Sequence, residues 1–251
     1  MTATISPLLR GQGLPEYSAI DPQMVSRDLP ALLGALNDEF SALEQTLEQA
    51  MSSDAPLLWD SVMNPMQRIS ERLRWSWGVV SHLNGVCNSK DLRDAHAAQQ
   101  SDVVRLGNRL GQSQVLHRAL ERLRDQPAEP LSETRQRILS AELLSMHHRG
   151  VGLEPDVQSA FNQSSERLAA LSTQFSNHVL DATQQWTLML TDPEQVAGLP
   201  QRALDALAAA ARDAGETNAT ASSGPWLLGL DRPRSGAFLT HARNRDLRAT
   251  V

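Results

Sequence analysis

The side chains best suited to chemistry in this sequence are a few histidines, serines and one cysteine, and their spacing decides what they can do. His147 and His148 are adjacent, and adjacent residues of a helix point about 100° apart, so the pair cannot bind one metal ion from a regular helix. No other histidine has a second histidine three or four residues away. We therefore predict no catalytic residue and no metal site in this chain, and we expect the adjacent pair to stabilise a helix end through its dipole.

Other residues superficially match parts of a nucleophilic or phosphate-binding site. Ser81 directly precedes His82, so on a helix the two side chains diverge and cannot serve as a nucleophile and its base. Cys87 shows no sign of activation, and we predict that it is buried and packs as a small apolar side chain. The glycine pairs at 11–13 and 150–152 lack the third glycine and the preceding strand of a phosphate-binding loop, so both are interpreted as turns.

Composition excludes several classes of protein. The 251 residues carry a net charge of −6, with 41% hydrophobic, 21% charged and only 4% aromatic residues. This balance is typical of a helical globular protein, and it includes no excess of basic residues that would bind nucleic acid. A single cysteine cannot form an intramolecular disulfide, no apolar run approaches the 18 residues of a membrane span, and no secretory signal precedes the first helix. We therefore expect a cytoplasmic protein with no nucleic-acid or membrane partner.

Apolar residues recur at helical spacing along most of the chain. Dense proline and glycine over residues 1–20 predict an extended arm, after which Asp21-Pro22 predicts a capped helix that ends near Ser52-Ser53. The next apolar series predicts a short helix and then a longer one that restarts at Pro65, because proline interrupts a helix. Further helices are predicted by the same spacing after Asn88-Ser89, after Ser132 with an end at Gly150, and from Glu154-Pro155 with a stripe from Val157 to Val179.

After Ala182 the residue types change from those of long amphipathic helices to those that favour strands. The runs 186–190 and 226–230 are rich in residues that favour strands, and a helix at about 200–214 lies between them, so we expect the runs to pair as a small sheet. Residues 215–224 are interpreted as a surface loop, and a last helix is expected to begin near Arg243. The predicted fold class is mainly α: a lobe of long amphipathic helices with a small β element near residues 186–230.

Two segments are too unusual for generic helices. The run from Trp75 to Arg93 is rich in Trp, Gly, His and Asn, and with the run from Leu171 to Thr183 it resembles the thimet oligopeptidase and oligopeptidase A family of zinc metallopeptidases. Three shorter blocks also resemble the family: Gly150 to Leu153, which lies between the two runs, and Ala197 to Pro200 and Asn244 to Arg248, which follow them. Trp75 and Trp77 are expected to be core anchors.

The resemblance implies the N-terminal region of a two-lobed helical peptidase whose channel admits short peptides to one zinc ion. It divides the chain into an arm (1–20), a helical N-terminal domain (21–184), and a small sheet that begins the truncated catalytic region (185–251). The family's His-Glu-x-x-His motif is missing, since no histidine here precedes glutamate, so none of its zinc ligands maps onto this chain. We expect a substrate-gating lobe that binds no zinc and is inactive alone.

The partners implied by the resemblance are short peptides and a separate C-terminal catalytic half. Whether the chain is naturally truncated, one half of a split gene or a cut fragment stays open at this point. A stand-alone helical module that binds peptides or a protein is the alternative function. One substrate-binding candidate follows from the predicted sheet: Leu188 lies in a strand whose edge could pair with an extended peptide.

Overall fold

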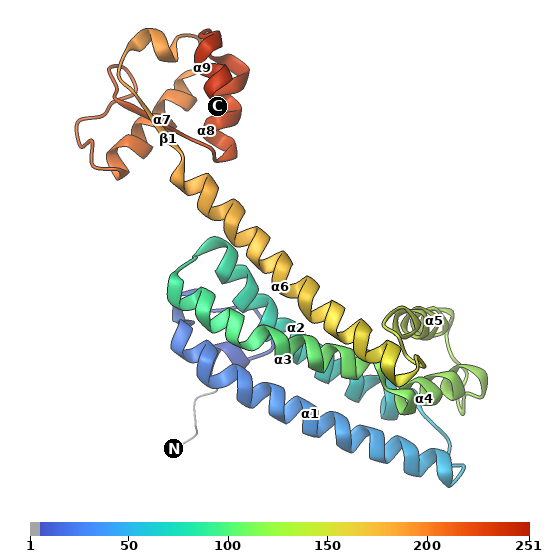
Figure 1. The fold of residues 1–251 in the computed structure, drawn as a ribbon. Coiled ribbons are helices and arrows are strands. Elements are labelled where there is room, and N and C mark those ends of the chain that lie inside the picture. Colours follow the sequence, from blue (N-terminus) through green and yellow to red (C-terminus); the bar gives the residue numbers. More distant parts are fainter. Residues whose placement is uncertain (1–5) are drawn as a thin grey trace. The chain divides into compact units, whose positions relative to one another are not determined.

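The computed structural model describes residues 6–251. These form two compact units, one that ends at Ser172 and one that covers Thr173–Val251. Residues 1–5 of the predicted extended arm lie outside the described residues. The described part is mainly helical with a single two-stranded sheet (Figure 1), which confirms the predicted fold class.

From residue 6 onward, the first unit holds two short 3-10 turns, five helices and most of a sixth. Their bounds are η1 Pro7–Leu9, η2 Tyr17–Ala19, α1 Pro22–Ser52, α2 Trp59–Val86, α3 Lys90–Gln112, α4 Gln114–Asp125, α5 Glu133–His148 and α6 Pro155–Gln185, of which α6 ends in the second unit. The second unit continues with β1 Thr187–Leu190, η3 Pro193–Val196, α7 Gln201–Asp213, β2 Trp226–Gly229, α8 Arg232–His241 and α9 Arg245–Thr250. Among the described helices, none is both long and apolar enough to cross a membrane.

Local capping sets the helix starts as the sequence predicts. The side chain of Asp21 accepts a 2.7 Å hydrogen bond from the backbone N–H of Met24, and Pro22 occupies the first turn, where a missing N–H costs nothing. Ser89 caps α3 and Ser132 caps α5 through the same kind of bond. Each cap satisfies one backbone donor that the first turn of a helix leaves unpaired.

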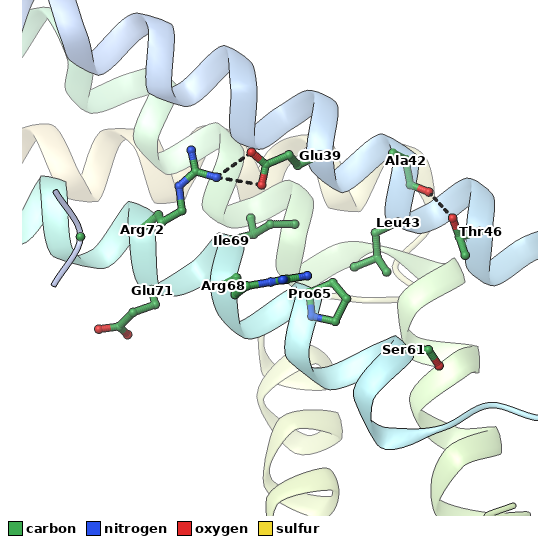
Figure 2. A pocket seen from close by; sticks show the side chains of 11 residues that line it. Glu39, Ala42, Leu43, Thr46, Ser61, Pro65, Arg68, Ile69, Glu71 and Arg72 are labelled. Atoms are coloured by element: carbon green, nitrogen blue, oxygen red, sulfur yellow. Dashed lines mark hydrogen bonds and ion pairs between the residues drawn. The ribbon is translucent and has the colours of Figure 1, made fainter. Parts of the chain in front are cut away.

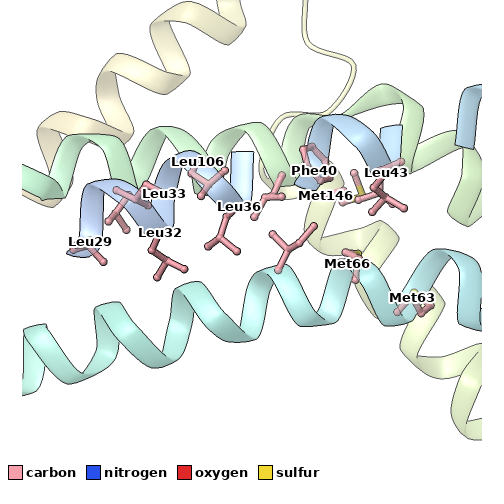
Figure 3. Close-up of a cluster of buried hydrophobic side chains, with 14 of the residues drawn as sticks. Leu29, Leu32, Leu33, Leu36, Phe40, Leu43, Met63, Met66, Leu106 and Met146 are labelled. Atoms are coloured by element: carbon pink, nitrogen blue, oxygen red, sulfur yellow. The ribbon is translucent and has the colours of Figure 1, made fainter. Parts of the chain in front are cut away.

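The core of the first unit lies between α1 and the helices α2, α3 and α4 that pack against it (Figure 3). Leu29, Leu36 and Phe40 of α1 are fully buried there. Leu8, from the segment before α1, is also fully buried, and Ser76 of α2 donates a 2.9 Å hydrogen bond to its carbonyl oxygen. The described part of the predicted arm is therefore fixed to the helices by both packing and a buried hydrogen bond.

The prediction that Pro65 separates two helices is wrong. Residues 59–86 form one helix, α2, with Pro65 inside it. Val62, Met63, Met66 and Ile69 on both sides of the proline are buried, so an unbroken helix places the whole stripe in the core. That burial is worth more than the roughly 3 kcal/mol that an internal proline costs a helix.

The sequence patterns also miss two helices, α4 and α8. Ser113 ends α3 and caps α4, accepting a 3.1 Å hydrogen bond from the N–H of Leu116, so one residue separates the two helices. In α8, the side chain of Asp231 caps the helix and Pro233 lies in its first turn. Both helices begin by the same capping chemistry as α1. Helix α4 buries a short apolar stripe from Leu116 to Leu123, whereas α8 buries only Phe238.

The small sheet of the second unit confirms the predicted strand pair. β1 and β2 are antiparallel, with Leu188 opposite Leu228 and Leu190 opposite Trp226. Helix α7 packs against β2, and Leu190, Trp226, Leu228 and Phe238 form the core of this unit. The helices predicted at about 200–214 and after Arg243 correspond to α7 and α9. Residues 215–224 lie between α7 and β2 and include a Thr220–Gly224 bridge.

Candidate functional site

A cavity of about 810 Å³ lies between α1 and α2 (Figure 2). Leu43 and Ile69 give it apolar walls, and Arg68 extends over Pro65 at its side. Arg72 Nη1 donates hydrogen bonds of 2.6 and 2.8 Å to the two carboxylate oxygens of Glu39 and so joins the two helices at the rim. Both side chains are partly exposed to solvent, so this pair fixes geometry more than it adds stability.

A second and larger groove, of about 970 Å³, runs along α2 on the side that meets α3, α4 and α5. Leu73, Trp77, Val103 and Ile138 supply apolar surface, while arginine and glutamate side chains supply charge. Arg68 borders this groove as well as the first one. Apolar walls with a few polar groups suit the binding of a peptide or protein segment.

The shape of the larger groove depends on a close approach between two helix ends. Gly111 of α3 is buried, and a Cβ atom added there would lie 2.4 Å from Cδ of Arg149. The Arg149 side chain therefore lies across α3 where only glycine leaves room for it. Next to it, Gln112 Nε2 donates a 2.8 Å hydrogen bond to the carbonyl oxygen of Arg149, which ties the end of α3 to the end of α5.

The residues singled out from the sequence do not form a catalytic constellation. Ser81 Oγ lies 3.5 Å from Nε2 of His96 in α3, and the ring of His82 faces Tyr17 at 5.2 Å between centroids. The predicted divergence of Ser81 and His82 is therefore confirmed. His96 is 4% exposed, and its burial lowers the pKa of the imidazole. A neutral ring facing one hydroxyl at this long distance gives no activated nucleophile.

The adjacent histidines occupy the last turn of α5, as predicted. His147 and His148 are both exposed, with ring centroids 6.0 Å apart. Across residues 6–251, no group of three or more His, Cys, Asp or Glu residues is placed to hold a metal ion. A catalytic zinc ion needs three protein ligands, so the described residues do not fit the zinc that the sequence resemblance implies.

The prediction that Cys87 is buried is wrong. Cys87 is exposed, because it occupies the C-cap position of α2, where the chain leaves the helix. Trp75 and Trp77, in contrast, pack against the core of the first unit as expected. Gly11 and Gly150 adopt φ angles of 68° and 88°, which confirms that the two glycine pairs lie in turns.

Leu188 lies in β1, and its side chain packs partly buried against the core of the second unit. In the described sheet, β1 pairs with β2 and with no further strand, so one edge of β1 carries no strand partner. The sequence analysis predicts neither groove of the first unit, because each depends on how whole helices pack together.

Comparison with known proteins gives a consistent result. Residues 29–158 match the model of the family described as neurolysin/thimet oligopeptidase, N-terminal domain. The whole chain is 36% identical to a probable cytosolic oligopeptidase A and 35% identical to an organellar oligopeptidase A (chloroplastic/mitochondrial), both from Arabidopsis thaliana, and covers 35% and 31% of them. Over 244 residues, 97% of this chain, it is 32% identical to oligopeptidase A from Escherichia coli, of which it covers 34%. The chain thus spans about a third of the length of these relatives.

Proposed function

The chain belongs to the neurolysin/thimet oligopeptidase N-terminal domain family, and we propose that it forms the substrate-gating N-terminal lobe of a zinc oligopeptidase that hydrolyses short peptides. The observation that carries this proposal is the match to oligopeptidase A over the full 251 residues, about a third of each relative. A region shared from end to end with peptidases has its natural role within the same kind of assembly.

The chemistry of the chain supports a gating role over a catalytic one. No histidine in the sequence precedes a glutamate, so the His-Glu-x-x-His motif is missing. The two grooves of the first unit combine apolar walls with charged rims and contain no paired nucleophile and base. Such surfaces can select and orient a peptide, while general-base chemistry and zinc come from another part of the assembly.

That other part is the C-terminal catalytic region, supplied as a continuation or as a separate polypeptide. We place the helical lobe at residues 21–184, after an arm over residues 1–20, and the start of the catalytic region at 185–251. The β1 edge around Leu188 is the proposed contact for extended peptide backbone. A cytosolic location is part of the proposal, supported by the cytosolic relative, although a second relative is organellar.

A stand-alone helical module that binds peptides or a protein is the alternative. The larger groove favours it, because about 970 Å³ with apolar walls is enough for several side chains of a bound segment. Under this alternative the chain binds its ligand without any catalytic partner. Titration of the isolated chain with fluorescent peptides distinguishes the two, since a gating lobe alone should bind them weakly.

A chimaera tests the leading proposal. Residues 1–251 of this chain would replace the corresponding third of the cytosolic Arabidopsis relative, which leaves that relative's remaining two-thirds in place. We expect cleavage of short quenched fluorogenic peptides, inhibition by a metal chelator, and no cleavage of folded proteins. A chimaera that folds cooperatively but leaves these peptides intact would contradict the proposal.

A further inference from the structure

Helix α2 carries a proline in the wall of the cavity between α1 and α2, which we call the α1–α2 cavity. Each carbonyl oxygen of an α-helix points toward the residue four positions later and accepts a hydrogen bond from its backbone N–H. For Ser61 that residue is Pro65, which has no N–H. Ser61 and Pro65 both line the cavity. The Ser61 carbonyl oxygen therefore lacks its helical donor at a place that a ligand can reach.

One charged side chain of the α1–α2 cavity has no partner to neutralise it. Arg72 pairs with Glu39 at 2.6 Å, and Glu71 pairs with Arg74 at 2.6 Å, so both carboxylates of the lining are compensated. Arg68 forms no ion pair and no side-chain hydrogen bond with any of the described residues. The cavity therefore has an excess of positive charge, and a free guanidinium suits a carboxylate of a ligand.

These two unpaired groups converge over Pro65. The Arg68 side chain extends over the proline ring (Figure 2), because side chains of a helix point toward its N-terminus. The Ser61 carbonyl points toward the same ring from the opposite direction. Leu43 of α1 and Ile69 of α2 form the apolar wall beside them. One part of the cavity thus offers a cationic donor, a hydrogen-bond acceptor and apolar surface together.

We propose that the α1–α2 cavity binds the C-terminal residue of a short peptide whose last side chain is apolar. The terminal carboxylate pairs with Arg68, the N–H of the last residue donates to the Ser61 carbonyl oxygen, and its side chain packs against Leu43 and Ile69. A fatty acid has no N–H for the carbonyl, and an inorganic anion uses the arginine alone. The proposal rests on the function proposed above in taking short peptides as ligands, and it adds which end of the peptide this lobe holds.

Binding of matched peptides to the 251-residue chain tests this assignment. Ligand-observed NMR would compare a hexapeptide that ends in leucine with the same peptide as a C-terminal amide and with a version methylated at the last amide nitrogen. We expect a Kd on the order of 0.1 mM for the free acid. The amide should bind about tenfold more weakly, because it loses a charge-assisted hydrogen bond, and the methylated peptide about three- to tenfold more weakly.

Equal affinity of the free acid and the amide would overturn the proposal. Decanoate serves as the competing class of ligand, since it has a carboxylate and an apolar body but no N–H. If decanoate binds as tightly as the peptide and methylation has no effect, the cavity recognises apolar carboxylates in general and the peptide end is not its ligand.

Two variants of α2 assign the binding to this cavity. Arg68→Gln should weaken the free acid about tenfold and leave the affinity of the amide unchanged. The matched control is Arg118→Gln, which removes the same charge from an exposed arginine of α4. Pro65→Ala supplies the N–H that pairs with the Ser61 carbonyl, so it should raise the midpoint of thermal unfolding and yet weaken peptide binding about three- to tenfold. Among the described residues, Pro65 lines the α1–α2 cavity but not the larger groove, so this variant distinguishes the two.

The methylated peptide completes the test of the carbonyl. In Pro65→Ala, methylation should cost no further affinity, because the acceptor is already occupied. A further loss of the same size, or unchanged binding in either variant with wild-type circular dichroism, would overturn the assignment. The peptidase role fails separately: binding that depends on Arg68 and Pro65 beside an inactive chimaera leaves the cavity assigned, whereas an active chimaera without that dependence leaves only the peptidase role.

Discussion

The imidazole of His96 stacks against the indole of Trp77, with ring centroids 4.3 Å apart and planes inclined by 26°. The stack joins α3 to α2 at a buried position. Nδ1 of His96 has no hydrogen-bond partner among the described residues, and Nε2 faces Ser81 Oγ at 3.5 Å. Burial without a carboxylate partner favours the neutral ring, which is why the pKa of His96 is lowered.

This lowered pKa predicts a loss of stability in mild acid. Above about pH 6.5, the usual pKa of histidine, the ring is neutral in both states and contributes no pH dependence. As the pH falls below that value, the unfolded chain binds a proton that the folded chain does not, so the free energy of unfolding decreases until the folded-state pKa is reached. Denaturant unfolding at pH 7.5 and 5.5 should show a smaller decrease for His96→Phe, which keeps a stacked ring. If the free energy of unfolding of His96→Phe decreases as much as that of wild type, the prediction is contradicted. The control is His148→Gln, which replaces an exposed histidine and should behave as wild type.

Two glycines of α3 should respond in opposite ways to alanine. Gly107 has open space at the position that a Cβ atom would take, so Gly107→Ala should stabilise the protein by up to about 1 kcal/mol through helix propensity. Gly111→Ala brings the new methyl against Arg149 and should destabilise it by about 1 to 3 kcal/mol. Thermal unfolding of the two variants gives the comparison, and equal stabilisation would show that Arg149 moves away freely.

The segment before α1 should contribute measurably to stability. Leu8 is fully buried, so Leu8→Ala should lower the free energy of unfolding by about 2 to 5 kcal/mol. Leu14, which is 89% exposed, gives the matched control, and Leu14→Ala should change it by less than about 0.5 kcal/mol. Urea titration measures both values. Similar small effects at the two positions would mean that the segment is not held on the helices in solution.

Local chemistry makes much of this fold predictable. The Asp21-Pro22 start and the end of α5 before Gly150 each depend on residues close together in sequence. The β1–β2 pair joins residues farther apart, but each strand is marked by its own run of strand-favouring residues. The prediction fails at Pro65 because it considers only the local tendency of proline to interrupt a helix. Burial of the apolar residues on both sides of Pro65 outweighs that tendency. It fails at Cys87 because cysteines are usually buried, whereas this one follows the last turn of α2.

The surfaces of the chain are harder to predict than its elements. The periodicity of α6 identifies an apolar stripe, but periodicity cannot say whether the chain itself covers that stripe. The grooves beside α2 depend on which helices pack together, and such contacts join residues tens of positions apart. Sequence alone therefore predicts no residue of either groove as a binding residue.

The isolated chain should show no zinc-dependent peptidase activity. A metallopeptidase needs three protein ligands and an activated water, and the described residues contain no group suited to hold the ion. Purified chain with added zinc should leave quenched fluorogenic peptides intact, while the chimaera measured in parallel shows that the assay works. Turnover that a chelator abolishes would prove this prediction wrong.

The edge of β1 that carries no strand partner can be tested as a contact for substrate. In the chimaera, Leu188→Pro removes one backbone N–H from β1, and proline is tolerated in a sheet only at an edge or a bulge. If extended substrate pairs with β1, the substitution should raise KM several-fold with little change in kcat, because the β1 backbone would bind the peptide without taking part in the chemistry. Leu188→Ala is the matched control, since it removes the same packing against the second core and keeps the N–H. Circular dichroism of the chimaera must match wild type for the comparison to count. A KM equal to that of Leu188→Ala, with the fold intact, would leave β1 a purely structural strand.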